Sequence, residues 1–209
     1  MSTALIVIDM QRDFCAPGGY ADQAGLDISL LRAPIPAITR LLEAARQKGW
    51  LVLHTREGHR ADMSDLPDSK RLRAENAGAP IGSAGPLGRL LIRGEYGHDL
   101  IDELQPLPGE PVIDKPGYSA FAHTDLELLL RNRGITHLWI TGVTTEVCVS
   151  STLRSAVERG YACTLVSDAC ASGYPELHAA ALAMVDVEGG LFGRVCDSQR
   201  LLAELETLA

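Results

Sequence analysis

The run Ala4-Leu5-Ile6-Val7-Ile8 is continuously apolar and ends at the charged residue Asp9. It is too short for a transmembrane helix or a signal peptide, and no basic segment precedes it. A short apolar run bounded by polar residues indicates a strand buried on both faces of a parallel sheet. Asp9 then stands at the carboxyl end of that strand.

Similar runs at residues 50–54, 111–114, 137–141 and 162–167 predict four more strands. Helical patterns lie between and after them, at residues 35–48, 125–133, about 145–159, 175–187 and 198–208. This alternation predicts an α/β fold of three layers: a mostly parallel, Rossmann-like sheet with helices on both faces. We expect one domain over residues 1–209.

Local signals mark several helix ends. Thr124 followed by Glu127 fits a capping box, and Gly49, Gly134 and Gly160 each stand just after a predicted helix, where a left-handed residue is favoured.

Residues 57–109 form the exception, with eight glycines, five prolines and little periodicity apart from a possible short strand or helix near residues 87–93. We interpret this segment as a long excursion that helps to form a site or a subunit contact.

Composition narrows the function classes. Lys plus Arg number 19 against 27 Asp plus Glu, a net charge of -8 without a basic stripe, which argues against nucleic-acid binding. The five cysteines are odd in number and lack Cys-x-x-Cys spacing, so free thiols in a reducing compartment fit better than disulfides. We expect a cytoplasmic protein that does not bind membranes.

Three chemically useful residues follow predicted strands: Asp9, Lys115 and Cys148. Ligands of open parallel sheets bind beyond the carboxyl ends of the strands, so these residues should converge. Cys148 lies at a predicted helix N-terminus, where backbone N–H groups and a nearby ammonium favour a nucleophilic thiolate. Asp9 can serve as general acid and base, and N–H groups of residues 142–148 can form an oxyanion hole.

Each residue has a plainer interpretation when taken singly. A buried Cys is usually inert packing, and we assign Cys15, Cys163, Cys170 and Cys196 to that class. Two other classes of function stay open: a Cys-His hydrolase using one of the six histidines, and a non-catalytic module that binds a small ligand.

The chain resembles the isochorismatase-like cysteine hydrolase superfamily through three segments: Val7-Ile8-Asp9-Met10-Gln11, Lys115-Pro116 and Thr141-Gly142-Val143-Thr144-Thr145-Glu146-Val147-Cys148-Val149. The resemblance implies a catalytic triad of Asp9, Lys115 and Cys148. It also implies a cis peptide bond between Val143 and Thr144, with the backbone N–H groups of Thr144 and Cys148 forming the oxyanion hole. The presence of the cysteine favours an amide or ureide substrate.

Within the superfamily the chain resembles the biuret hydrolase group and its relatives that act on triuret and ureidoacrylate. The resemblance implies a substrate-binding set of Phe14, Arg56, Glu57, Tyr118 and Glu188. Biuret hydrolase has Lys at the position of Tyr118 and Gln at the position of Glu188. A carboxylate at Glu188 would favour a neutral, N–H-rich ureide over an N-carbamoyl amino acid.

Nicotinamidases of this superfamily bind a metal near the second strand, but their ligand pattern is not reproduced around His54 and His59. We therefore expect no metal and no cofactor. The predicted substrate is a small biuret-like or triuret-like ureide, with N-carbamoyl amino acids, ureidoacrylate and maleamate-type compounds as alternatives. Relatives suggest a homo-oligomer, either a dimer or a tetramer.

Overall fold

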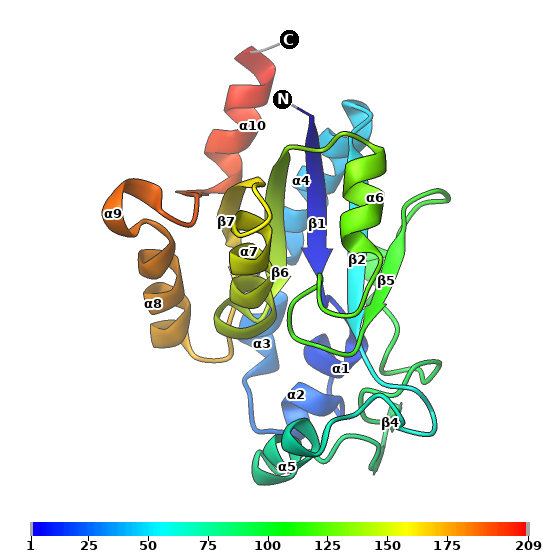
Figure 1. The fold of residues 1–209 in the computed structure, drawn as a ribbon. Coiled ribbons are helices and arrows are strands. Elements are labelled where there is room, and N and C mark those ends of the chain that lie inside the picture. The colour runs from blue at the N-terminus through cyan, green and yellow to red at the C-terminus, as the bar shows by residue number, and fades with distance from the viewer. Residues whose placement is uncertain (1, 208–209) are drawn as a thin grey trace.

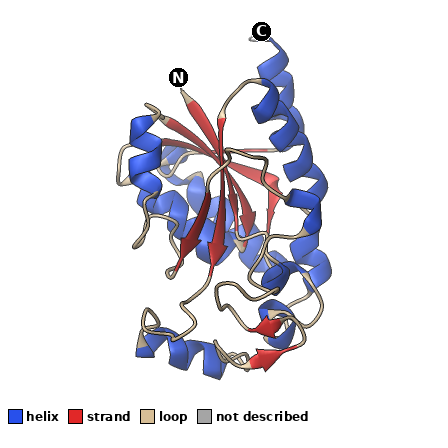
Figure 2. Cartoon of the chain, turned by 90° about the vertical axis from the view of Figure 1, so that its right-hand side faces the viewer, coloured by secondary structure: helices blue, strands red, loops and turns tan. Residues whose placement is uncertain are grey.

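The computed structural model describes residues 2–207, whose core is a six-stranded sheet in the order β5-β2-β1-β6-β7-β8. All neighbouring strands run parallel (Figures 1 and 2). The strands are β1 Thr3–Ile8, β2 Leu51–Glu57, β5 Val112–Lys115, β6 His137–Val143, β7 Ala162–Ala171 and β8 Arg194–Cys196. The predicted α/β class and parallel sheet are confirmed.

Helices cover both faces of the sheet (Figure 2). They are α1 Arg12–Cys15, α2 Tyr20–Gln23, α3 Ile28–Arg32, α4 Ile35–Gln47, α5 Asp68–Asn76, α6 Leu126–Asn132, α7 Ser150–Val157, α8 Pro175–Val185, α9 Val187–Gly190 and α10 Ser198–Thr207. Side chains of β1 alternate between two apolar clusters, because successive residues of a strand face opposite sides. Leu5 and Val7 pack with α4 and α10, whereas Ile6 and Ile8 pack with α6 and α7.

The predicted elements differ from the observed ones mainly at their ends. The predicted helix at 145–159 divides into a π-helical turn, η2 (Thr145–Val149), and α7, while the helix at 175–187 ends at Val185. The last residue of the helix predicted at 198–208, Leu208, lies outside the described residues. Strand β8 was not predicted, because three residues offer too short a pattern.

The glycine signals are confirmed, since Gly49, Gly134 and Gly160 have φ of 65°, 60° and 84°. The prediction of a capping box at Thr124 and Glu127 is wrong. Thr124 Oγ1 accepts the N–H of Leu126 at 3.3 Å instead of the N–H of Glu127. The Glu127 carboxylate is held by salt bridges to two arginines, Arg131 and Arg159.

The excursion at 57–109 contains α5, the two-residue strands β3 (Ala84–Gly85) and β4 (Gly88–Arg89), and the 3₁₀ turn η1 (Asp102–Leu104). The parts labelled α5 and β4 lie below the carboxyl ends of β1 and β2 in Figure 1. Buried Asp13 ties the excursion to the first helices, because its carboxylate accepts the N–H of Leu91 at 3.0 Å and the N–H of Tyr20 at 3.3 Å.

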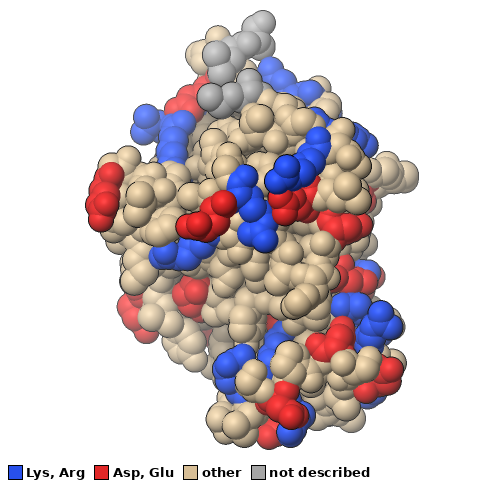
Figure 3. Space-filling model, viewed as in Figure 1, with Lys and Arg blue, Asp and Glu red and all other residues tan. Residues whose placement is uncertain are grey.

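Basic and acidic side chains are interspersed on the face shown in Figure 3. Among the described residues, no helix has both the length and the apolar character needed to cross a membrane.

Gly142, at the end of β6, is required by a close approach of two strands. Its φ is 110°, and a Cβ there would lie 2.0 Å from the carbonyl oxygen of Ile8. Because Ile8 precedes Asp9, any side chain at position 142 would push apart the two strand ends that carry Asp9 and Cys148.

We expect Gly142→Ala to lower the free energy of unfolding by roughly 3 kcal/mol or more, since the backbone strain and the clash with β1 add together. Urea unfolding followed by circular dichroism measures this. Gly160→Ala is the matched control: its φ is 84° but its Cβ would meet nothing within 4 Å, so only about 1 kcal/mol of strain is expected. Equal losses in the two variants would contradict the close-approach explanation.

Candidate active site

The carboxyl ends of β1, β2, β5 and β6 bring four side chains together. Asp9 follows β1, Glu57 and Lys115 end β2 and β5, and Cys148 lies in η2 after β6. Lys115 Nζ lies 2.8 Å from Asp9 Oδ2, 3.4 Å from Cys148 Sγ and 3.5 Å from Glu57 Oε2. The structure thus brings together the three residues predicted from the strand ends and adds Glu57.

Asp9 is held at the centre by its backbone and by Thr55. Its φ is 51°, and its Oδ1 accepts the hydroxyl of Thr55 at 2.6 Å. Oδ2 forms a buried salt bridge with the Lys115 ammonium at 2.8 Å. Burial raises the pKa of Asp9, against the opposing charge of Lys115, and the Glu57 charge raises it further. Asp9 is thus a buried carboxylate that is paired with Thr55 and Lys115, and its raised pKa suits it to take a proton.

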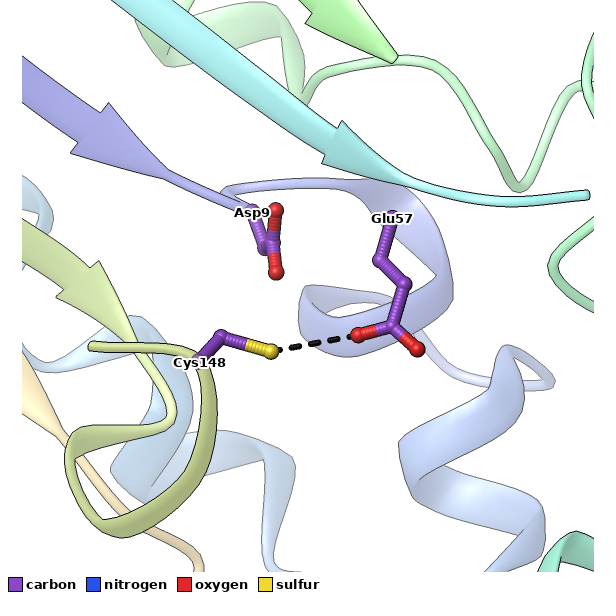
Figure 4. A group of neighbouring side chains, drawn as sticks. All are labelled: Asp9, Glu57 and Cys148. Carbon is purple, nitrogen blue, oxygen red and sulfur yellow. Dashed lines mark hydrogen bonds between the residues drawn. The ribbon is translucent and has the colours of Figure 1, made fainter. Parts of the chain in front are cut away.

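Cys148 does not sit in the environment expected for a resting thiolate. Its Sγ donates a hydrogen bond to Glu57 Oε2 at 3.1 Å (Figure 4). Burial raises the pKa of this thiol well above its usual range; Lys115 opposes the shift, and the charges of Glu57 and Asp9 add to it. The sequence-based expectation of a lowered pKa is therefore wrong, because burial and two carboxylates outweigh the ammonium.

Glu57 is fixed by two lysines. Its Oε1 forms a salt bridge with Lys70 Nζ at 2.6 Å, while Oε2 faces Lys115 and Cys148. Burial alone would raise the pKa of Glu57, but the ammonium groups of Lys115 and Lys70 lower it to about 2. Glu57 therefore carries its negative charge at any physiological pH.

Two residues that sequence reasoning missed hold Glu57 in place. Lys70 comes from α5, and its ammonium also donates to the Pro116 carbonyl at 2.6 Å. Gln11 donates to the Glu57 carbonyl at 3.0 Å and accepts the Glu57 N–H at 2.7 Å. Gln11 belongs to the Asp-Met-Gln segment that the sequence analysis singled out. Its role could not be predicted, because it depends on a contact with Glu57, 46 positions away.

The charges of the buried group balance when the thiol is neutral. The carboxylates of Asp9 and Glu57 oppose the ammonium groups of Lys115 and Lys70. The ligand atoms of Asp9, Glu57 and Cys148 lie within 4.8 Å of one another, a spacing that could suit a metal ion. Lys115 already faces all three, however, so a metal cation there would be repelled by the buried ammonium.

The histidines near the second strand pair with other carboxylates than those of Asp9 and Glu57. His54 Nε2 lies 3.3 Å from Glu110, and His59 Nδ1 lies 3.2 Å from Asp65. Among the described contacts, Cys148 Sγ pairs with Glu57 and Lys115 and with no histidine, which argues against a Cys-His hydrolase.

A cavity of about 360 Å³ opens onto the thiol. Its walls combine aromatic and small apolar side chains with two glutamates. The lining residues are Phe14, Tyr20, Ala21, Ala24, Leu26, Glu57, Ala77, Tyr118, Thr144, Glu146, Val147, Cys148 and Tyr174. Phe14, Glu57 and Tyr118 from the predicted substrate-binding set therefore face the cavity.

The other two members of that set do not. Arg56 points to the other side of β2 from Glu57, because neighbouring strand residues alternate, and it pairs with Asp114 at 2.8 Å and with Asp99 at 2.9 Å. Glu188 is exposed in α9, a segment distant from the carboxyl ends of the strands in Figure 1. The prediction that Arg56 and Glu188 lie in the pocket is therefore wrong, because neither residue of this chain lines the cavity.

The peptide bond between Val143 and Thr144 is cis, as the resemblance implied. The Thr144 carbonyl accepts the N–H groups of Val147 and Val149, each at 3.2 Å, and so closes the turn around Cys148. The oxyanion-hole role of the Thr144 and Cys148 N–H groups stays a prediction.

A buried Cys-Lys-Asp group beneath a cavity, at the carboxyl edge of a Rossmann-like sheet, defines a cysteine hydrolase. Comparison with known proteins agrees: residues 3–200 match the isochorismatase domain model. The chain therefore belongs to the isochorismatase family of hydrolases.

Individual relatives span nearly the whole chain. It is 38% identical over 207 residues to the ureidoacrylate amidohydrolase RutB of Azorhizobium caulinodans, covering 97% of this chain and 91% of that protein. An isochorismatase family protein from Desulfovibrio vulgaris has a TM-score of 0.81 at 32% identity, with 98% of each chain covered. N-carbamoylsarcosine amidase from Thermoplasma acidophilum has a TM-score of 0.72 at 25% identity, with 95% of this chain and 97% of that chain covered.

We expect Gln11→Leu to lower the free energy of unfolding by about 2–4 kcal/mol, because the buried N–H of Glu57 and the carbonyls of Glu57 and His98 lose their partner. Chemical denaturation measures this. Gln23→Leu, at an exposed position whose side chain bonds only the Gly18 carbonyl, should change stability by less than about 0.5 kcal/mol. Two variants of equal stability would show that Gln11 does not hold the strand ends.

Proposed function

We propose that the protein hydrolyses a terminal amide or ureide C–N bond of a small substrate through a thioester on Cys148, releasing ammonia. One observation carries this proposal: Cys148 Sγ lines the cavity and lies 3.4 Å from the Lys115 ammonium, which also contacts Asp9. Nucleophile, proton acceptor and compensating charge are thus within reach of one bound carbonyl.

In the proposed reaction, Asp9 Oδ2 takes the thiol proton, and Lys115 stabilises the resulting thiolate. The thiolate attacks the terminal carbonyl carbon, and N–H groups of Thr144 and Cys148 hold the oxyanion, each contributing on the order of 3 kcal/mol. Asp9 returns its proton to the departing amine, so that ammonia leaves. Asp9 then deprotonates water, which attacks the thioester and regenerates the thiol.

The cavity wall favours a neutral, N–H-rich end of the substrate. Its lining contains two glutamates, Glu57 and Glu146, and no lysine or arginine among the described residues. Glu146 Oε2 is buried without a hydrogen-bond partner in the described part of the chain. A carboxylate accepts N–H groups and repels a carboxylate, so biuret-like or triuret-like ureides fit this wall. Glu146 takes the place that the sequence had suggested for Glu188.

A second candidate is ureidoacrylate, because the relative RutB is named for that activity and is 38% identical. Ureidoacrylate presents the same terminal ureide to Cys148 but also carries a carboxylate. An ammonia-release screen over biuret, triuret, ureidoacrylate, N-carbamoyl amino acids, nicotinamide and maleamate separates the candidates. The cytoplasmic location and the homo-oligomer stay predictions.

We expect Cys148→Ser to lower turnover by on the order of 10³-fold or more, because a hydroxyl in this site is a far weaker nucleophile than the thiolate. Steady-state ammonia release on the best substrate of the screen measures the loss, with circular dichroism showing an unchanged fold. Cys170→Ser, at a buried cysteine outside the cavity, serves as the control and should keep most of the activity. Substantial hydrolysis by Cys148→Ser would rule out the thioester.

Replacing Glu146 by Gln should raise kcat/KM for ureidoacrylate relative to biuret by about tenfold, because one repulsive carboxylate leaves the cavity. Both substrates are measured on both proteins, so that a general loss of activity cancels in the ratio. Glu188→Gln is the matched control and should leave the ratio unchanged, since Glu188 is exposed outside the cavity. An unchanged ratio in Glu146→Gln would remove the charge argument for neutral substrates.

A further inference from the structure

We propose that Glu57, which Lys70 holds in place, is a positioning residue with two roles. It keeps the Cys148 thiol protonated before substrate binds, and it exchanges that thiol for an N–H of the substrate when substrate enters the cavity. The thiol is thereby activated only by a bound amide or ureide. The part of this proposal that concerns the substrate rests on the proposed function.

The first support is the direction of the thiol hydrogen bond. Cys148 Sγ donates to Glu57 Oε2 at 3.1 Å, as Figure 4 shows, while Asp9 Oδ2 is paired with the Lys115 ammonium at 2.8 Å. The proposed acceptor of the catalytic proton is therefore not the group that holds the proton at rest. Before attack, the thiol has to leave Glu57 and turn to Asp9.

The second support is that Glu57 is immobile whereas the thiol can rotate. Gln11 bonds both the N–H and the carbonyl of Glu57, and Lys70 holds Oε1 at 2.6 Å. Oε2 therefore stays at the cavity wall whichever donor it receives. Rotation about χ1 of Cys148 costs little in comparison with moving a side chain held at three points.

The third support is the chemistry of the exchange. A terminal amide whose carbonyl carbon approaches Sγ carries its N–H groups to the same side of the cavity, which Glu57 lines. An N–H group is a stronger hydrogen-bond donor than a thiol, so the substrate displaces the S–H from Oε2. The thiol proton then passes to Asp9 Oδ2, and the net charge of the buried group does not change.

Lys70, which pairs with Glu57, comes from helix α5 and not from the parallel sheet. It is 6% exposed although it belongs to the polar helix α5, and its ammonium lies 5.0 Å from the centre of the Tyr118 ring. Without Lys70, two carboxylates would face the single ammonium of Lys115, and a thiolate would add a further negative charge. The titratable groups that face Glu57 are Asp9, Tyr20, His59, Lys70, Lys115 and Cys148.

The experiment measures the alkylation rate of Cys148 by iodoacetamide against pH in the full-length protein without substrate, using mass spectrometry of the Cys148 peptide. In Glu57→Gln the thiol loses its anionic acceptor, so we expect alkylation at neutral pH to accelerate at least about tenfold, equivalent to one unit of thiol pKa. In Lys70→Met the buried charge becomes more negative, so alkylation should slow. Glu188→Gln removes an exposed carboxylate outside the cavity and should leave the rate within about twofold.

Turnover gives the second readout: Glu57→Gln should react faster with iodoacetamide yet hydrolyse ureides more slowly, with KM raised. A merely structural role predicts a different pattern, in which both Glu57→Gln and Lys70→Met loosen the site and label faster, together with the four other cysteines. That pattern, or a Glu57→Gln protein that labels no faster than wild type, overturns the proposal. Labelling needs no hydrolysis, so the outcome is independent of Cys148→Ser.

Should Glu57→Gln fail to fold, because Lys70 is left buried without its partner, the charge-balanced double variant Glu57→Gln/Lys70→Met replaces it. The double variant should again label faster than Lys70→Met alone, since it lacks the anionic acceptor. Equal labelling of the double variant and Lys70→Met contradicts the role of Glu57.

Discussion

The buried ammonium of Lys115 is the interaction on which the site depends. It is fully buried, and the charges of Asp9 and Glu57 raise its pKa against the effect of burial. Removing such a charge from water costs several kcal/mol, which only close opposite charges can offset. The parallel sheet supplies them, because the strand order β5-β2-β1-β6 places Lys115, Glu57, Asp9 and the turn of Cys148 side by side.

Balance of charge, more than the position of Cys148 near a helix start, decides the state of the thiol. A helix dipole is worth about 0.3–1 kcal/mol at an exposed position and about 2 kcal/mol in favourable buried ones. Burial of a thiolate costs more than that, and here two carboxylates already face the sulfur. Sequence reasoning weighed the dipole and the lysine but could not weigh Glu57, because the contact joins residues 91 positions apart.

How far the sequence predicts this site depends on how local each signal is. Asp9, Lys115 and Cys148 were placed correctly, since short apolar runs identify the strands and chain direction identifies their carboxyl ends. Lys70 was missed because α5 is polar on nearly all sides and sits in a segment without periodicity. Arg56 was misplaced because the predicted strand ended at residue 54, whereas β2 continues to Glu57 and its alternation puts Arg56 and Glu57 on opposite sides.

The long segment at 57–109 thus takes part in the chemistry and does more than cover the site. The sheet edge alone provides a nucleophile, a proton acceptor and an ammonium, a set that suits many acyl compounds. Lys70 from α5 neutralises Glu57 and so allows a second carboxylate to remain charged beside the thiol, while Ala77, just after α5, lines the cavity. A single insertion can in this way shape the pocket and set the resting state of the nucleophile. Sequence changes confined to this segment would therefore alter substrate choice and thiol reactivity together, although the segment contains none of Asp9, Lys115 and Cys148.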